Sequence, residues 1–244
     1  MKKSKWSLLA MLFALVLVLA ACGTDEEEKQ QGDAADQAEM NDANFASSVT
    51  NEGDAIEGGT LMVAMQKDEP FQGIFSYALY EDGYDSDLMT FANTSVFATD
   101  GDFLLTDEGI ASMEVNEETK VVTVKIREDV KWSDGEALKV EDLLLPYYII
   151  GHKDYMGVRY DSDFRNIVGA EEYHDGKAET ISGLNKVDET TYTLQLNSIS
   201  PGLYSGGDGL LTYAEPSHVM ASIPVAELIE HDAVRKNPLS LSAF

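Results

Sequence analysis

The chain has 244 residues, of which 17 are lysine or arginine and 44 are aspartate or glutamate, so its formal net charge is −27. Nucleic-acid binding needs lysines and arginines that displace counterions from phosphates, and this charge therefore excludes nucleic acid as an expected partner. A single cysteine excludes a disulfide framework and any zinc or iron–sulfur site built from several thiols. The 44% content of hydrophobic residues is close to the globular average and supports one or two packed domains.

Residues 1–21 have the pattern of a secretory signal peptide. Three lysines lie within the first five residues, and an uncharged apolar run follows from Leu8 to Ala21. The run ends in Leu-Ala-Ala-Cys-Gly, which resembles the lipobox of bacterial lipoproteins, with Cys22 at the acylated position. That resemblance implies a cut before Cys22 and a lipid that anchors the chain on the outer, extracytoplasmic face of a bacterial cell membrane. An uncleaved transmembrane helix is the alternative, although the run is short for a span of about 20 residues.

Residues 22–59 are predicted to form an acidic, disordered tether. Almost no large apolar side chains occur here, so the segment cannot bury enough surface to order itself. Its run of four acids, Asp25–Glu28, is more typical of a solvated stretch than of a cation site. Such a tether would hold the folded part, residues 60–244, away from an anionic membrane surface.

The segment 60–244 mixes predicted strands and helices. Apolar periodicity predicts, in chain order, a buried strand at 61–66, a helix at 87–97, a hairpin of 113–115 with 122–126, a helix at 140–150, a strand at 191–196 and an amphipathic helix at 225–234. These elements alternate without a strict repeating unit. The fold class is therefore α/β, of the mixed α+β type.

One part of this segment resembles a known family. Residues 125–136 and 140–143 resemble the signature of the solute-binding proteins of oligopeptide and dipeptide ABC importers, extracellular solute-binding protein family 5. The signature residues are Trp132, Ser133, Asp134, Gly135 and Asp142. Further stretches agree in the same order along the chain: 58–65, 69–70, 188–196, 216–220 and 235–238. The resemblance implies the first lobe of a two-lobed, periplasmic-binding-protein-like fold.

The resemblance also implies a function without catalysis: a lipid-anchored, monomeric protein that captures oligopeptides for an ABC importer. Its partners would be the permease subunits with their ATPases, and it would need no cofactor and no metal. The candidate ligand-binding residues are Glu69, Pro70 and Phe71, after the first strand, although this position also fits an ordinary loop. Trp132 fits a core anchor better than a platform for ligand.

The sequence departs from the family pattern at several positions. Ser240 and Ser242 stand where the family has glycines in a tight turn, so strain is expected there. Lys139 replaces a threonine helix cap, and Pro146 should kink or shorten the helix at 140–150. The chain stops at Phe244, well short of a family member, so we expect the second lobe to be absent. A fragment of a longer product and a truncated copy both fit this expectation.

The sequence also allows alternative functions. A surface lipoprotein that kept only the first lobe could act in adhesion or signalling, or the chain could be a non-functional fragment. A secreted hydrolase is disfavoured, because no nucleophile, base and orienting group occur in a recognisable pattern. The four histidines are scattered without the spacing of a metal site, so we expect neither catalytic residues nor metal ligands.

Overall fold

The computed structural model describes residues 58, 60, 62, 64, 71–90, 93–207, 209–236 and 239–242. The chain divides into two compact units, Met1–Ala64 and Met65–Phe244, and the fold below is that of the second. Cys22, the tether and most of the strand expected at 61–66 lie outside the described residues. In the part of the chain that the structure describes, no helix has the length and apolar character needed to cross a bilayer.

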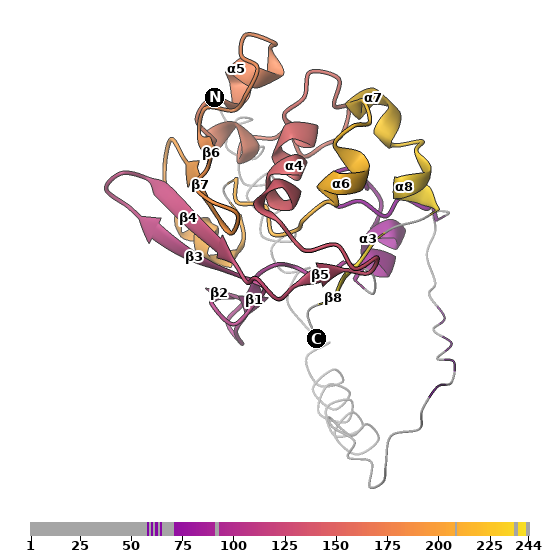
Figure 1. Cartoon of the computed structure of the whole chain (residues 1–244). Helices are drawn as coiled ribbons and strands as arrows, with labels where there is room; N and C mark the ends of the chain where they lie inside the picture. The colour runs from indigo at the N-terminus through magenta and orange to yellow at the C-terminus, as the bar shows by residue number, and fades with distance from the viewer. Residues whose placement is uncertain are drawn as a thin grey trace, which may run out of the picture. The chain divides into compact units, whose positions relative to one another are not determined.

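A four-stranded antiparallel sheet forms one side of the unit (Figure 1). Its strands, in spatial order, are β3 (Ala111–Asn116), β4 (Val121–Ile126), β7 (Thr191–Gln195) and β6 (Leu184–Lys186). The predicted hairpin is confirmed, with Met113 opposite Val124. Alternation along β4 buries Val122, Val124 and Ile126 and leaves Lys125 exposed, because successive side chains of a strand point to opposite faces.

Two short ladders complete the strands. The first pairs β1 (Ala98–Thr99) with β2 (Leu105–Thr106), and the second pairs β5 (Lys131–Trp132) with β8 (Leu241–Ser242). The second ladder joins the family signature to residues more than one hundred positions later in the chain. The last described residues of the unit therefore help to hold the signature in place.

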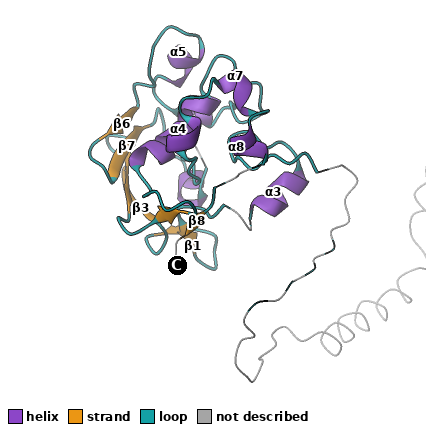
Figure 2. Ribbon diagram, turned by 45° about the vertical axis from the view of Figure 1, so that its right-hand side comes forward, coloured by secondary structure: helices purple, strands orange, loops and turns teal. Residues whose placement is uncertain are grey.

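Most of the helices lie on the other side of the unit (Figure 1). The helices are α3 (Gly83–Met89), α4 (Val140–Ile150), α5 (Ala170–His174), α6 (Ser217–Met220), α7 (Val225–Leu228) and α8 (Asp232–Arg235), with short 3-10 helices η1 (Phe164–Asn166) and η2 (Pro201–Ser205). In both views α4 lies between the sheet and the group formed by α3, α7 and α8 (Figures 1 and 2). Helix α4 is accordingly buried on almost every side, as expected of a helix at the centre of a core.

Two predicted helices have different bounds in the structure. The helix predicted at 87–97 begins at Gly83, because the Asp82 carboxylate caps it by accepting N–H bonds from Tyr84 and Asp85 at 2.9 and 3.0 Å. The helix predicted at 225–234 is two helices, α7 and α8, and the ring of His231 caps the second. In both places a local cap, rather than apolar spacing, sets where the helix starts.

Pro146 was predicted to kink or shorten the helix at 140–150; it lies inside α4, which continues to Ile150, so the helix is not shortened. A proline has no N–H to donate to the carbonyl four residues earlier, which here is the carbonyl of Asp142. That carbonyl accepts the N–H of Glu215 instead, at 2.8 Å. A neighbouring segment thus replaces the hydrogen bond that the proline removes.

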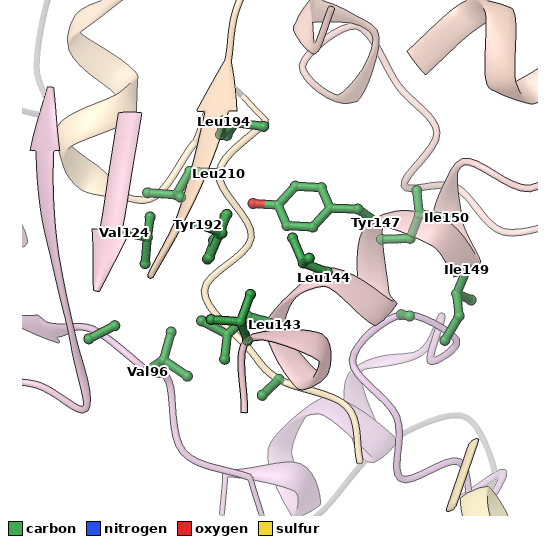
Figure 3. Packing of buried hydrophobic residues seen from close by; sticks show 14 of the residues in the cluster. Val96, Val124, Leu143, Leu144, Tyr147, Ile149, Ile150, Tyr192, Leu194 and Leu210 are labelled. Carbon is green, nitrogen blue, oxygen red and sulfur yellow. The ribbon is translucent and has the colours of Figure 1, made fainter. Parts of the chain in front are cut away.

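The core is centred on the contact between α4 and the sheet. Figure 3 shows Leu144 and Tyr147 of α4 pointing toward Tyr192 and Leu194 of β7. The rings of Tyr147 and Tyr192 lie 6.4 Å apart between centroids, and the Tyr147 hydroxyl accepts the N–H of Leu211 at 2.9 Å. Burial raises the pKa of Tyr147 to about 12, so this hydroxyl stays neutral and serves as a fixed hydrogen-bonding group.

Asp142, in the first turn of α4, joins three segments through its 1%-exposed carboxylate. One oxygen accepts the indole N–H of Trp132 and the backbone N–H of Lys139, both at 2.9 Å. The other accepts the backbone N–H of Ser217 at 2.8 Å and its hydroxyl at 2.5 Å. Asp142 therefore holds the N-cap residue of its own helix through the N–H of Lys139, and it ties β5 and the start of α6 to that helix.

The turn after Trp132 is fastened in the same way. Ser133 donates its N–H to the carbonyl of Ser240 at 2.8 Å, and the His218 ring lies 2.8 Å from the Asp134 carboxylate. Gly135 has a φ of 95°, which a side chain would disfavour. Ser240 and Ser242 do not have positive φ, so the strain expected there is absent: this part of the chain pairs as β8 instead of turning tightly.

Replacing Asp142 by alanine should lower the free energy of unfolding by about 3 kcal/mol or more, because buried N–H donors of Trp132, Lys139 and Ser217 would lose their acceptor. Urea denaturation followed by tryptophan fluorescence measures this. The matched control is Asp129→Ala, which removes an exposed carboxylate from Arg127 and should leave the midpoint unchanged. Equal, small effects of the two substitutions would contradict the role given to Asp142.

Candidate functional site

The segment 71–80 follows the predicted first strand and is fastened to two helices. Gly73 donates its N–H to the buried carboxylate of Asp85 in α3 at 3.0 Å, and Phe75 donates to the carbonyl of Val234 in α8 at 2.9 Å. Phe71, at the start of this segment, is 46% exposed and packs edge-on against Phe75. Glu69 and Pro70 lie outside the described residues, so binding of ligand by these three residues stays a prediction.

Further along, the same segment contributes to a cluster of one arginine and four tyrosines, which we call the arginine–tyrosine cluster: Tyr77, Tyr80, Tyr155, Arg159 and Tyr213. The rings of Tyr77 and Tyr213 stack with centroids 4.3 Å apart. The Arg159 guanidinium lies 3.9 Å above the Tyr80 ring and donates to the Tyr80 carbonyl at 2.5 Å. The cluster thus presents aromatic faces beside a positive charge, the combination that favours cation–π contact and planar polar ligands.

A buried glutamate lies behind the cluster. Glu215 is 2% exposed, and one carboxyl oxygen accepts the Ser76 hydroxyl at 2.6 Å and the Ala78 N–H at 3.2 Å. Burial raises the pKa of Glu215 to about 7, although these hydrogen bonds and the nearby charge of Arg159 act in the opposite direction. Glu215 therefore joins the loop before α6 to the segment that carries Tyr77 and Tyr80.

A small pocket of about 120 Å³ opens beside the cluster. Tyr77 and Arg159 line one part of it, and Gly206 and Gly207 line another. Glycines leave backbone groups accessible, and Asp161 and Asp163 also line the pocket, so the walls offer an aromatic ring, a guanidinium, peptide groups and two carboxylates. Such walls suit binding of a peptide group.

Two further pockets occur in the described part of the molecule. One, of about 490 Å³, lies at the β3–β4 turn and η2 and is lined by Glu117, Lys120 and Tyr204. The other, of about 190 Å³, lies between Tyr155, Met156 and Ile229. Neither combines an arginine with stacked aromatic rings, which is why the arginine–tyrosine cluster is the favoured candidate.

The signature residues do not line the pocket beside the cluster. Trp132 is 1% exposed, in the core, and Ser133, Asp134, Gly135 and Asp142 make the structural contacts described above. No sequence pattern indicates the cluster, because its members are spread over 137 positions. The signal that could have been noticed is Arg159, one of only four arginines in an acidic chain.

Comparison with known proteins identifies relatives of this chain. A family model described as "Bacterial extracellular solute-binding proteins, family 5 Middle" matches residues 105–241. The oligopeptide-binding protein OppA of Lactococcus lactis subsp. lactis is 30% identical over 257 residues, covering all of this chain and 41% of OppA. The oligopeptide-binding protein AppA of Bacillus subtilis is 29% identical over 121 residues, half of this chain and 19% of AppA.

Solved structures agree with these matches. Lactococcal OppA, complexed with an endogenous peptide in the closed conformation, superposes with a TM-score of 0.67 and 28% identity over 72% of this chain and 34% of OppA. B. subtilis AppA in complex with a nonapeptide gives a TM-score of 0.56 at 22% identity over 70% of this chain and 30% of AppA, a likeness of fold alone. The predicted α/β class and its likeness to part of a periplasmic-binding-protein fold are confirmed. The chain spans about two fifths of the length of the OppA relatives that it matches.

Substituting Glu215 by glutamine should remove a pH dependence of stability. Because the carboxyl pKa is about 7 in the folded state against 4.5 ordinarily, its stabilising contribution is complete below pH 4.5 and is lost as the pH rises through 7. This shift corresponds to about 3 kcal/mol. Thermal unfolding between pH 4 and about pH 8 should therefore show wild type losing stability relative to Glu215→Gln.

The matched control is Glu114→Gln, which removes a glutamate from the exposed face of β3. The melting temperature of Glu114→Gln should change with pH in the same way as that of wild type. If the melting temperature of Glu215→Gln also changes with pH as wild type does, the Glu215 carboxyl does not titrate as its burial implies.

Proposed function

This chain belongs to the bacterial extracellular solute-binding proteins of family 5, and we propose that it captures oligopeptides for an ABC importer without catalysing a reaction. The observation that carries the proposal is the match to oligopeptide-binding OppA, which extends over the whole of this chain. The OppA structure with bound peptide, which this fold resembles at a TM-score of 0.67, supports it.

The chemistry of the arginine–tyrosine cluster is compatible with peptide capture. Peptides of varied sequence share a backbone of planar amide groups, and these can stack on the rings of Tyr77 and Tyr213 and hydrogen-bond to exposed backbone groups. In the two-lobed arrangement that the family resemblance implies, the peptide would lie between this face and a second lobe. Phe71 would add an exposed apolar contact to the same segment.

We assign the first part of the chain to export and attachment. Residues 1–21 act as a signal peptide, Cys22 carries the lipid, and residues 22–59 form the tether to the solute-binding domain, 60–244. Membership of an extracellular family supports an extracytoplasmic location. The permease subunits with their ATPases are the proposed partners of the monomer.

A Cys22→Ser protein should no longer incorporate a labelled fatty acid, and it should no longer sediment with the membranes on cell fractionation. Retention of both properties would refute this anchor.

The protein purified from the cells that make it should carry peptides of varied sequence, which mass spectrometry of the acid-released ligands detects. Isothermal titration of the emptied protein with a pentapeptide library should then show binding without peptide cleavage. Binding of another solute class in place of peptides, or hydrolysis of the library, would contradict the proposal.

A Phe71→Ala variant tests the predicted ligand segment in the same titration. It should weaken peptide binding by about fivefold or more, since an aromatic contact of this kind is worth about 1 kcal/mol or more. The control is Phe103→Ala, which removes a 76%-exposed phenylalanine from the loop between β1 and β2. An unchanged affinity of Phe71→Ala would remove Phe71 from the binding site.

A further inference from the structure

Glu215 links the two segments that carry the stacked rings of the arginine–tyrosine cluster. Its carboxyl accepts the Ser76 hydroxyl at 2.6 Å and the Ala78 N–H at 3.2 Å, and these two residues flank Tyr77. Tyr213, whose ring stacks on that of Tyr77, lies two residues before Glu215 in the chain. One carboxyl therefore fixes the backbone on both sides of the stack. We call the contacts of Glu215 with Ser76 and Ala78 the Glu215 clip.

The clip is enclosed by further buried contacts. The N–H of Glu215 donates to the Asp142 carbonyl at 2.8 Å, and the Tyr155 hydroxyl donates to the Ala78 carbonyl at 2.8 Å. Ser76 and Ala78 are themselves fully buried. Water can therefore hydrate the Glu215 carboxyl only if the two linked segments move apart. That movement would also separate the stacked rings.

The carboxyl in the clip has neutral hydrogen-bond donors. Among the described residues, no nitrogen of a lysine, arginine or histidine lies within 4.0 Å of it. Burial raises the pKa of Glu215 to about 7, against the hydrogen bonds from Ser76 and Ala78 and the charge of Arg159, which lower it. Above this pH the buried group carries a charge, and a buried charge favours states in which water reaches it. The closed clip is therefore most stable at low pH and is destabilised as the pH rises through 7.

The groups around the clip were considered as alternative sources of pH dependence. The other charged or titratable side chains on the elements packed around it are those of Tyr77, Tyr80, Asp142, Tyr155, Arg159, Asp161, Asp163, Tyr213 and His218. An arginine stays charged, and aspartates are ordinarily ionised well below neutral pH. Burial raises the pKa of Tyr77, Tyr155 and Tyr213 above its ordinary value, so these hydroxyls stay neutral. Histidine is the side chain that ordinarily titrates near neutral pH, so His218, which faces Asp134 at 2.8 Å, requires a control.

We propose that Glu215 is a positioning residue for peptide capture, which holds Tyr77 against Tyr213 and makes peptide affinity fall as the pH rises through neutrality. This inference rests on the proposed peptide function and adds a pH dependence to it. A peptide that binds the stacked pair favours the closed clip, so it must also favour the protonated carboxyl. Peptide binding near neutral pH therefore takes up a fraction of a proton from the buffer.

The test is isothermal titration of a pentapeptide library into the protein purified from its own cells and emptied of ligand. Between about pH 6 and about pH 8.5, the affinity of wild type should fall about threefold or more, within the tenfold per pH unit that one linked proton permits. Titrations in two buffers of different ionisation enthalpy should show net proton uptake. Glu215→Gln keeps an oxygen that accepts the Ser76 and Ala78 bonds, so it should match wild type at low pH and lose the additional fall in affinity.

This comparison isolates Glu215, because both proteins bind the same library and protonation of the peptides cancels. A purely structural role of Glu215 would leave the pH dependence of the two proteins equal. That result would overturn the inference while peptide capture itself stands. Absence of binding by wild type at every pH would overturn both proposals.

Two further variants locate the proton. Ser76→Ala removes a hydrogen bond that lowers the Glu215 pKa, so the fall in affinity should move to higher pH. His218→Asn should keep the pH dependence of wild type, and its loss in this variant would overturn the assignment to Glu215. If Glu215→Gln fails to fold, proton uptake by wild type and the upward shift in Ser76→Ala decide the matter, and absence of either would contradict the proposal.

Discussion

The described fold depends on one buried carboxylate, that of Asp142. A charge that is 1% exposed is stable only when hydrogen bonds compensate its desolvation, and here both oxygens accept two bonds each. These four bonds fix Trp132, the start of α4 and the start of α6. Because Pro146 has no N–H to donate to the Asp142 carbonyl, this carbonyl accepts the N–H of Glu215. Glu215 in turn holds Ser76, so the signature in the core is connected to the arginine–tyrosine cluster.

The spacing of apolar and turn residues correctly predicted the elements whose geometry depends on residues nearby in the chain. The hairpin β3–β4, strand β7 and helix α4 follow from apolar alternation, turn residues and helical spacing. The helices near 87–97 and 225–234 were placed incorrectly, since Asp82 and His231 cap them at positions that apolar spacing does not reveal. The expected shortening of α4 at Pro146 does not occur for a related reason. The donor that replaces its missing N–H comes from 69 residues later in the chain.

The candidate site could be predicted only in part. The family resemblance correctly identified the relatives, but the residues that carry it, Trp132 to Gly135 and Asp142, serve the fold and do not line the pocket beside the cluster. The cluster forms because the segment at 77–80, the loop at 155–159 and Tyr213 converge in three dimensions. No spacing pattern in the sequence indicates that these three segments lie together. Arg159, one of four arginines in an acidic chain, was the available hint, and its significance depends on the tyrosines that the fold brings around it.

The central claim is that peptide binds at the arginine–tyrosine cluster, behind which Glu215 and Asp142 hold the supporting segments. Hydrogen–deuterium exchange of the protein from its own cells, emptied of ligand and then saturated with a pentapeptide library, tests it most directly. The account predicts slower exchange at 76–80, 155–161 and 209–215 on binding. Protection confined to the β3–β4 turn and η2, around the larger pocket at Glu117 and Tyr204, would contradict it.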